Sequence, residues 1–207
     1  MATSASLARP LPLSHGASRR RLEVFSPKLS RRLSLGSYNA WRLWLALEAN
    51  PEVISFCERP TRLRGHRGPL VDFWAQFRSD PAGEYWVLDH SHDEPESPAE
   101  FPRRFHDSRV RVIDAQTLAS WEVPLANWAR IVPFLVSYRL YRQPLLEQSI
   151  AVVLGRSTPL SEILERFSEH DRSLVEASVY WLLATGRVRS PDIAVEPLCV
   201  ATRFRRS

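Results

Sequence analysis

The chain has 207 residues, of which 44% are hydrophobic and 25% charged, a composition typical of a soluble globular protein with one large or two small domains. No apolar run approaches the roughly 18 residues that a membrane-spanning helix needs, which excludes an integral helical membrane protein. The two cysteines, Cys57 and Cys199, lie far apart and form no Cys-x-x-Cys zinc motif. This cysteine usage predicts a reducing compartment.

Positive charge is concentrated at the two ends of the chain, whose net charge is +5 and whose isoelectric point is about 9.7. Up to residue 32 there are seven basic residues against one acidic residue, Glu23, and residues 203–206 read Arg-Phe-Arg-Arg. Basic ends favour contacts with phosphates, and solvated tails are the alternative interpretation. We predict a disordered basic arm over residues 1–22, with an organellar transit peptide as the rival interpretation.

The N-terminal half predicts one helix and several strands. Residues 37–49 have the length and apolar content of a helix, with Ser37 as its N-cap and Pro51 after its end. Asp80 to Gly83 predict a turn, and residues 89–100 predict an acidic loop. Strands are predicted over residues 53–57, 70–77, 85–88 and 109–113.

The C-terminal half is predicted to be mostly helical. Helices are expected over residues 115–120, 127–140, 144–154, 159–167 and 172–185. Thr158 and Asp171 are the expected N-caps of the last two helices, and Gly186 is the expected stop. A strand at Val188, a turn over 190–192 and a strand over 198–204 then form a hairpin. Three helices followed by a β-hairpin are the order of a winged helix, with a boundary near Gln143.

Short motifs along the chain occur in an order that resembles one known family. They are a Ser-x-Lys-x-x-Arg motif over 26–31, a Leu-Glu-x-x-Pro-x-Val-x-x-Phe pattern over 47–56, Glu58-Arg59-Pro60, Val71-Asp72-Phe73, a Leu-Leu-x-x-Gly-x-Val helix stop over 182–188, and Glu196-Pro197-Leu198. Their order and spacing resemble the TnsA-like family of DNA transposition proteins, over roughly residues 24–90 and 144–204.

The resemblance implies an α/β fold and a set of partners. It implies a restriction-endonuclease-like mixed sheet with flanking helices over 23–115, a helical linker over 116–143 and a winged-helix domain over 144–207. It also implies a bacterial, cytoplasmic, Mg²⁺-dependent endonuclease subunit that cuts the 5′ ends of transposon DNA. The implied partners are DNA, a DDE transposase subunit and an AAA+ ATPase regulator.

Metal-dependent cleavage needs carboxylates around Mg²⁺ and a lysine near the attacking water. Asp72 matches the family's first strand carboxylate. The positions that would complete the site hold Gly36, Ala40, Leu88 and His90, and none of these is a carboxylate or a lysine. Lys28 is the only lysine of the chain. The sequence therefore predicts that cleavage is lost or weak.

A rebuilt site is the alternative. A slip of one residue in register would bring Asp89 near Asp72 as a second metal ligand, with His90 as the proton shuttle in place of the lysine. Asp72, Asp89 and His90 are therefore the candidate catalytic residues, and Asp72 and Asp89 the candidate metal ligands. An acidic solvated loop after a strand is the simpler interpretation of the same residues.

The candidate DNA contacts are basic. Lys28, Arg31 and Arg32 combine charge density with the first family motif, and Arg187 and Arg189 lie where a winged helix approaches phosphates. The alternative is ordinary surface charge. Three functions stay open: an active TnsA-like subunit, a catalytically inactive relative that acts as a DNA-binding adaptor, and a winged-helix DNA-binding regulator without nuclease ancestry.

Overall fold

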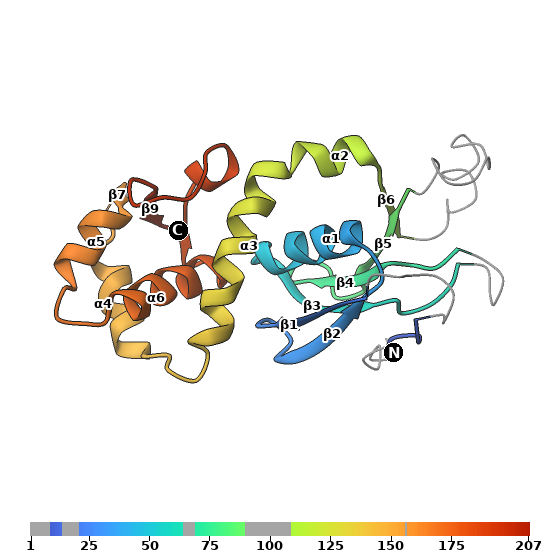
Figure 1. Ribbon diagram of the computed structural model, residues 1–207, viewed down its shortest axis with the longest axis horizontal. Coiled ribbons are helices and arrows are strands. Elements are labelled where there is room, and N and C mark those ends of the chain that lie inside the picture. The colour runs from blue at the N-terminus through green and yellow to red at the C-terminus, as the bar shows by residue number, and fades with distance from the viewer. Residues whose placement is uncertain (1–8, 14–20, 64–68, 90–108, 156) are drawn as a thin grey trace. The chain divides into compact units, whose positions relative to one another are not determined.

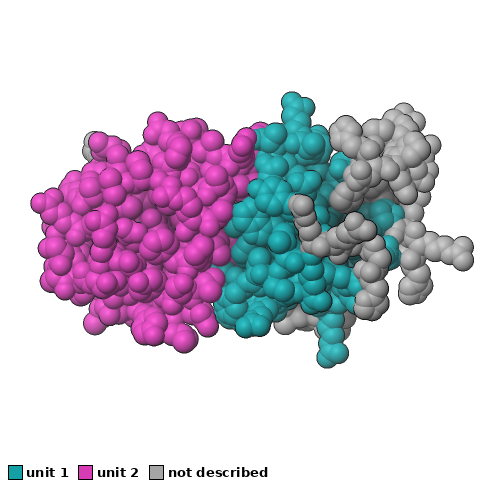
Figure 2. Space-filling view, viewed as in Figure 1, with its two compact units in different colours: residues 1–47, 52–119 teal, residues 48–51, 120–207 magenta. Residues whose placement is uncertain are grey.

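The computed structural model describes residues 9–13, 21–63, 69–89, 109–155 and 157–207 (Figure 1). The chain divides into an N-terminal unit, residues 1–47 and 52–119, and a C-terminal unit, residues 48–51 and 120–207, which Figure 2 colours separately. Most of the predicted linker thus belongs to the C-terminal unit. Among the described helices, none is both long enough and apolar enough to cross a membrane.

The N-terminal unit begins with a β-hairpin that the sequence analysis missed. Strands β1 (Leu22–Ser26) and β2 (Arg31–Leu35) pair antiparallel, and Ser30 turns the chain with a positive φ of 53°. The Leu29 N–H donates to the Ser26 hydroxyl over 3.0 Å inside this turn. Residue 22 of the predicted arm is therefore part of a strand. Within the arm, residues 1–8 and 14–20 lie outside the described residues.

A four-stranded mixed sheet forms the body of this unit, as predicted. Strands β3 and β4 and strands β4 and β5 pair antiparallel, while β5 and β6 pair parallel, in the order β3-β4-β5-β6. The flanking helices are labelled in Figure 1. The bounds are β3 Val53–Glu58, β4 Phe73–Phe77, β5 Glu84–Leu88, β6 Val110–Ile113, α1 Tyr38–Ala49 and α2 Ala115–Ser120. Of the predicted loop over 89–100, only Asp89 lies within the described residues.

Local chemistry fixes the ends of α1 and the turn between β4 and β5. The Ser37 hydroxyl accepts a hydrogen bond from the Ala40 N–H at 3.0 Å, which confirms the predicted N-cap. Gly83 has a φ of +68°, and a Cβ there would lie 2.5 Å from the Ala75 carbonyl oxygen. Only glycine fits this turn, which sets where β5 begins and thereby the register of β5 beside β4.

The C-terminal unit combines helices with a three-stranded antiparallel sheet in the order β7-β9-β8. The predicted cap at Thr158 is wrong. Thr158 belongs to strand β7, where it pairs with Phe204, and the helix begins at Leu160 without a side-chain cap. The elements are α3 Glu122–Ser137, α4 Pro144–Val153, β7 Thr158–Pro159, α5 Leu160–Arg166, α6 Arg172–Ala184, β8 Val188–Arg189, the 3₁₀ turn η2 Asp192–Ala194 and β9 Arg203–Arg206.

Helix α6 is the centre of this unit. It packs against α3, α4 and α5. Its N-cap is the predicted one, since the Asp171 carboxylate accepts a hydrogen bond from the Leu174 N–H at 2.9 Å. Gly186 ends the helix region with a φ of +74°. Its buried side chains, which point to all sides of the helix, are Val175, Ala177, Ser178, Val179, Tyr180, Leu182 and Leu183.

The segment between β8 and β9 is fixed by a buried amide. Asn127, on α3, is 2% exposed. Its side-chain nitrogen donates to the carbonyl oxygens of Ile193 and Glu196 at 2.8 and 2.7 Å. Its side-chain oxygen accepts from the Leu198 N–H at 2.7 Å. One side chain thus holds three points of the loop that leads into β9.

Candidate functional site

Asp72 lies immediately before β4, between the ends of two neighbouring strands. Its N–H donates to the Trp86 carbonyl at 3.1 Å, and its carbonyl accepts from the Arg59 N–H at 2.8 Å. One carboxylate oxygen accepts from the Leu88 N–H at 2.7 Å. The predicted neighbourhood of Asp72 and Leu88 is therefore present. The carboxylate, however, is engaged in holding the backbone of β5.

The residues around Asp72 do not fit the Mg²⁺ site that the family resemblance implies. Leu88 is 2% exposed and Ala40 is 7% exposed, and neither side chain can ligate a hard cation. The Asp89 N–H donates to the Ile113 carbonyl at 2.9 Å, so Asp89 extends the ladder between β5 and β6. Within the described residues, no three His, Cys, Asp or Glu side chains form a group that could hold a metal ion. His90 lies outside these residues.

Two of the residues that were predicted to contact phosphates, Lys28 and Arg31, form hydrogen bonds within the N-terminal unit. The Lys28 ammonium donates to the Leu47 carbonyl at 2.7 Å, in the last turn of α1. The Arg31 guanidinium donates to both carboxylate oxygens of Glu58, at 2.9 and 2.5 Å. Arg32 is exposed. The basic motif thus contains two structural cations and one that faces solvent.

Arg59 fixes the N-terminal segment against this unit. It follows β3 with a positive φ of 45° and is only 8% exposed. Its side chain donates to the carbonyls of Leu11 (2.9 Å) and Ser34, while its own carbonyl accepts from the Leu11 N–H at 2.9 Å. Burial lowers the pKa of Arg59 below its ordinary value. Residues 9–13 of the predicted disordered arm are therefore attached to the fold.

One face of the C-terminal sheet carries a row of arginines. Arg189 of β8 lies directly opposite Arg205 of β9. Residues opposite each other share a face, and so do residues two apart on one strand, which adds Arg203. Arg187 precedes Arg189 by two residues, and its carbonyl accepts from the Ser207 N–H at 3.2 Å, so it continues the ladder. We call Arg187, Arg189, Arg203 and Arg205 the arginine face.

The arginine face is exposed and strongly charged. All four side chains are exposed, whereas Phe204 and Val188, on the other face, are 0% and 1% exposed. Among the described residues, none of the four guanidinium groups forms an ion pair, although Asp192 accepts from the Arg203 backbone N–H at 2.8 Å. Like charges directly opposite each other on neighbouring strands destabilise a sheet. An anion with several phosphates, spaced along the strands, would relieve this repulsion.

Two of the four residues of the arginine face were candidates from the sequence alone. Arg187 and Arg189 were predicted as DNA contacts, whereas Arg203 and Arg205 were assigned only to a basic end. The alternation Arg-Phe-Arg over 203–205 is the signal that could have placed them, because alternate residues of a strand point the same way. The hairpin itself was predicted, but its second strand lies at 203–206 and the register that sets Arg205 opposite Arg189 had no local signal.

Comparison with known proteins leaves the family of the chain open. No protein-family model matches the sequence, and a search of characterised proteins finds no significant match.

Proposed function

We propose that this chain is a DNA-binding subunit of a TnsA-like transposition machine and that it does not itself cleave DNA. In this role it holds transposon-end DNA and contacts a DDE transposase subunit and an AAA+ ATPase regulator. The arginine face is the observation that carries the DNA-binding part of the proposal. The family motifs quoted above are the basis for the transposition part.

The order of elements supports this assignment. In the N-terminal unit, α1 precedes three antiparallel strands and then a strand parallel to the third, and this is compatible with a restriction-endonuclease-like sheet. In the C-terminal unit, the order α4-β7-α5-α6-β8-β9 is compatible with a winged helix, in which β8 and β9 form the wing. Both expectations from the family resemblance are therefore consistent with the topology.

We propose that cleavage is absent because the side chains around Asp72 lack the groups that a metal-dependent nuclease needs. The family positions hold Gly36, Ala40 and Leu88, and one oxygen of Asp72 accepts the Leu88 N–H. A metal-dependent nuclease needs several carboxylates at once, together with a cation near the scissile phosphate. Lys28, the only lysine, is bonded to the end of α1.

The mode of DNA binding follows from the burial of α6. In winged-helix proteins the third helix commonly enters the major groove and reads base edges. Here that helix packs against α3, α4 and α5, and the arginine face lies on and beside strands β8 and β9. We infer that the arginine face grips the phosphate backbone and that binding depends little on base sequence.

The test measures affinity for a paired duplex at several salt concentrations. In the variant Arg189→Ala/Arg205→Ala, affinity at low salt falls, and the slope of log K against log salt becomes shallower by about 2, since each phosphate contact contributes about 0.9. The control Arg78→Ala/Arg166→Ala removes two exposed arginines that lie outside the arginine face. Equal loss in the two variants, or no loss in either, would overturn the proposal.

A DNA-binding regulator without nuclease ancestry is the second candidate. It is favoured by the location of the arginine face, which lies entirely in the C-terminal unit and uses nothing around Asp72. Transposition assays with the DDE transposase and the AAA+ ATPase separate the two candidates. The transposition subunit is required for end joining in this assay, and the regulator is dispensable.

A further inference from the structure

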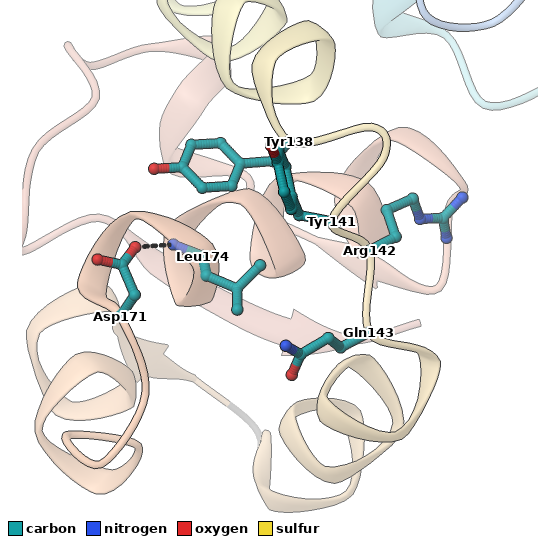
Figure 3. A pocket seen from close by; sticks show the side chains of 6 residues that line it. All are labelled: Tyr138, Tyr141, Arg142, Gln143, Asp171 and Leu174. Atoms are coloured by element: carbon teal, nitrogen blue, oxygen red, sulfur yellow. Dashed lines mark hydrogen bonds between the residues drawn. The ribbon is translucent and has the colours of Figure 1, made fainter.

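The C-terminal unit contains a pocket of about 550 Å³ beside the start of α6. Pockets that bind small molecules or single chemical groups have volumes of about 300–1,000 Å³. The residues that line it come from the connection between α3 and α4 and from the start of α6 (Figure 3). They are Tyr138, Tyr141, Arg142, Gln143, Asp171 and Leu174.

Two aromatic rings form one wall of this pocket. The rings of Tyr138 and Tyr141 lie 6.4 Å apart, centre to centre, at an angle of 66°. Tyr138 also stacks with Phe134 at 6.4 Å, whereas Tyr141 is 67% exposed. A large aromatic ring held this far in solvent offers a free face on which a planar group can stack.

Polar groups are placed around the aromatic wall. Gln143 supplies an amide that can both donate and accept hydrogen bonds. Asp171 uses one carboxylate oxygen to cap α6, and its second oxygen points away from the capping bond in Figure 3. A planar ligand with donors and acceptors along one edge would match this set.

The arginines in and next to the pocket wall are engaged within the protein. Arg139 donates to the Val136 carbonyl at 2.7 Å, and Arg172 pairs with Glu176 at 3.2 Å. Arg142 is fixed in place, since it donates to both oxygens of the buried Glu147 at 2.8 Å and stacks 4.2 Å from the centre of the Trp181 ring. The pocket therefore combines an aromatic platform with a hydrogen-bonding edge.

We propose that this pocket binds an unpaired nucleobase, stacked on Tyr141 with its polar edge towards Gln143 and Asp171. This deepens the proposed DNA-binding function and rests on it. Paired bases are hidden in the stack, so the pocket accepts a base only from a single strand, an overhang or an extrahelical position. Such a pocket increases the affinity for DNA with unpaired bases, and this contribution is separate from the phosphate contacts of the arginine face.

The experiment compares two duplexes of the same sequence, one fully paired and one with a single extrahelical 2-aminopurine. The full-length wild type is expected to bind the second duplex about tenfold more tightly and to quench its fluorescence, because stacking of one base on an aromatic side chain has an effect of this size. Tyr141→Ala abolishes both the preference and the quenching and leaves paired-duplex affinity unchanged. Tyr141→Phe keeps the stacking face and therefore the preference.

Tyr38→Ala is the matched control, because Tyr38 is also exposed, at 65%, and lies in the N-terminal unit. Equal affinity of the wild type for the two duplexes, or a preference that survives in Tyr141→Ala, overturns the nucleobase pocket while the duplex-binding function stands. A preference that survives in Tyr141→Ala would place recognition of the unpaired base elsewhere on the chain. If the wild type binds neither duplex, both proposals are overturned.

Discussion

Arg31 and Glu58 form an ion pair in which the guanidinium makes two bonds to one carboxylate whose side chain is only 3% exposed. The Arg31 side chain is 37% exposed, so the pair joins a surface cation to a buried anion. The carboxylate raises the pKa of Arg31 above its ordinary value by hydrogen bonding. This pair connects the β1–β2 hairpin to the end of β3.

Removal of Arg31 is therefore expected to destabilise the N-terminal unit. Arg31→Ala leaves the Glu58 carboxylate buried without its main partner, and we expect the free energy of unfolding to fall by about 2 kcal/mol. The neighbouring exposed residue gives the control: Arg32→Ala should change it by less than about 0.5 kcal/mol. Urea unfolding followed by circular dichroism measures both. Equal changes in the free energy of unfolding for the two substitutions would show that the ion pair does not stabilise the N-terminal unit.

The two cysteines are expected to differ in reactivity. Cys199 is exposed, and hydrogen bonds from the Ala201 backbone and from the Thr202 hydroxyl lower the pKa of its thiol. Cys57 is 2% exposed, and burial raises its pKa to about 11. A disulfide reagent at about pH 8 should label one thiol of the folded chain within minutes and the second only after denaturation. Cys199→Ser should abolish the fast phase, and Cys57→Ser should leave it intact.

The same burial predicts a loss of stability at alkaline pH. The pKa of Cys57 is raised in the folded state from its ordinary value of 9.0 to about 11. Its contribution to stability is complete below pH 9 and is lost as the pH rises towards 11, because the unfolded thiol ionises first. The urea midpoint of the wild type should fall across this window, and that of Cys57→Ala should fall less. Parallel curves would contradict this cause.

Asn127 is expected to control the loop that leads into β9. Asn127→Ala removes three hydrogen bonds and leaves buried backbone groups without partners, so the free energy of unfolding of the C-terminal unit should fall by about 3 kcal/mol. Hydrogen exchange of the Leu198 amide should be faster in this variant than in the wild type. The control Asn39→Ala, at an exposed position of α1, should leave both unchanged. Slow exchange at Leu198 in Asn127→Ala would count against the assigned role.

Cleavage of DNA is expected to be absent with Mg²⁺ or Mn²⁺, with and without the transposase partners. The positions that would complete a site around Asp72 hold Gly36, Ala40 and Leu88, and loss of even one preorganised charge commonly lowers the rate by about 10²–10³. A nicking assay on transposon-end DNA compares the wild type with Asp72→Ala and Asp89→Ala. Robust nicking that either substitution abolishes would show a rebuilt site.

Local signals made much of the fold predictable. The caps at Ser37 and Asp171 and the glycine turn at Gly83 depend on neighbouring residues, and each was found from the sequence. The β1–β2 hairpin was missed because Lys28 and the arginines around it were interpreted as phosphate contacts, with a solvated tail as the alternative. Their actual partners, Leu47 and Glu58, are 19 and 27 residues away.

The candidate site was less predictable for the same reason. The sequence indicated that Asp72 and Leu88 are neighbours, but not that the Asp72 carboxylate accepts the Leu88 N–H. It indicated Arg187 and Arg189, but the register that sets Arg205 opposite Arg189 depends on strand pairing. Asn127 gave no signal, because its partners are 66 to 71 residues away.

The arginine face has a consequence for where such a protein acts in a cell. Under the proposed function, a subunit that binds phosphates through the arginine face finds equivalent positions along the whole chromosome, and these outnumber transposon ends by many orders of magnitude. In that case its location on DNA is set by the protein that recruits it. Mutations that redirect the machine to new sites should accordingly arise in that partner and leave the arginine face unchanged.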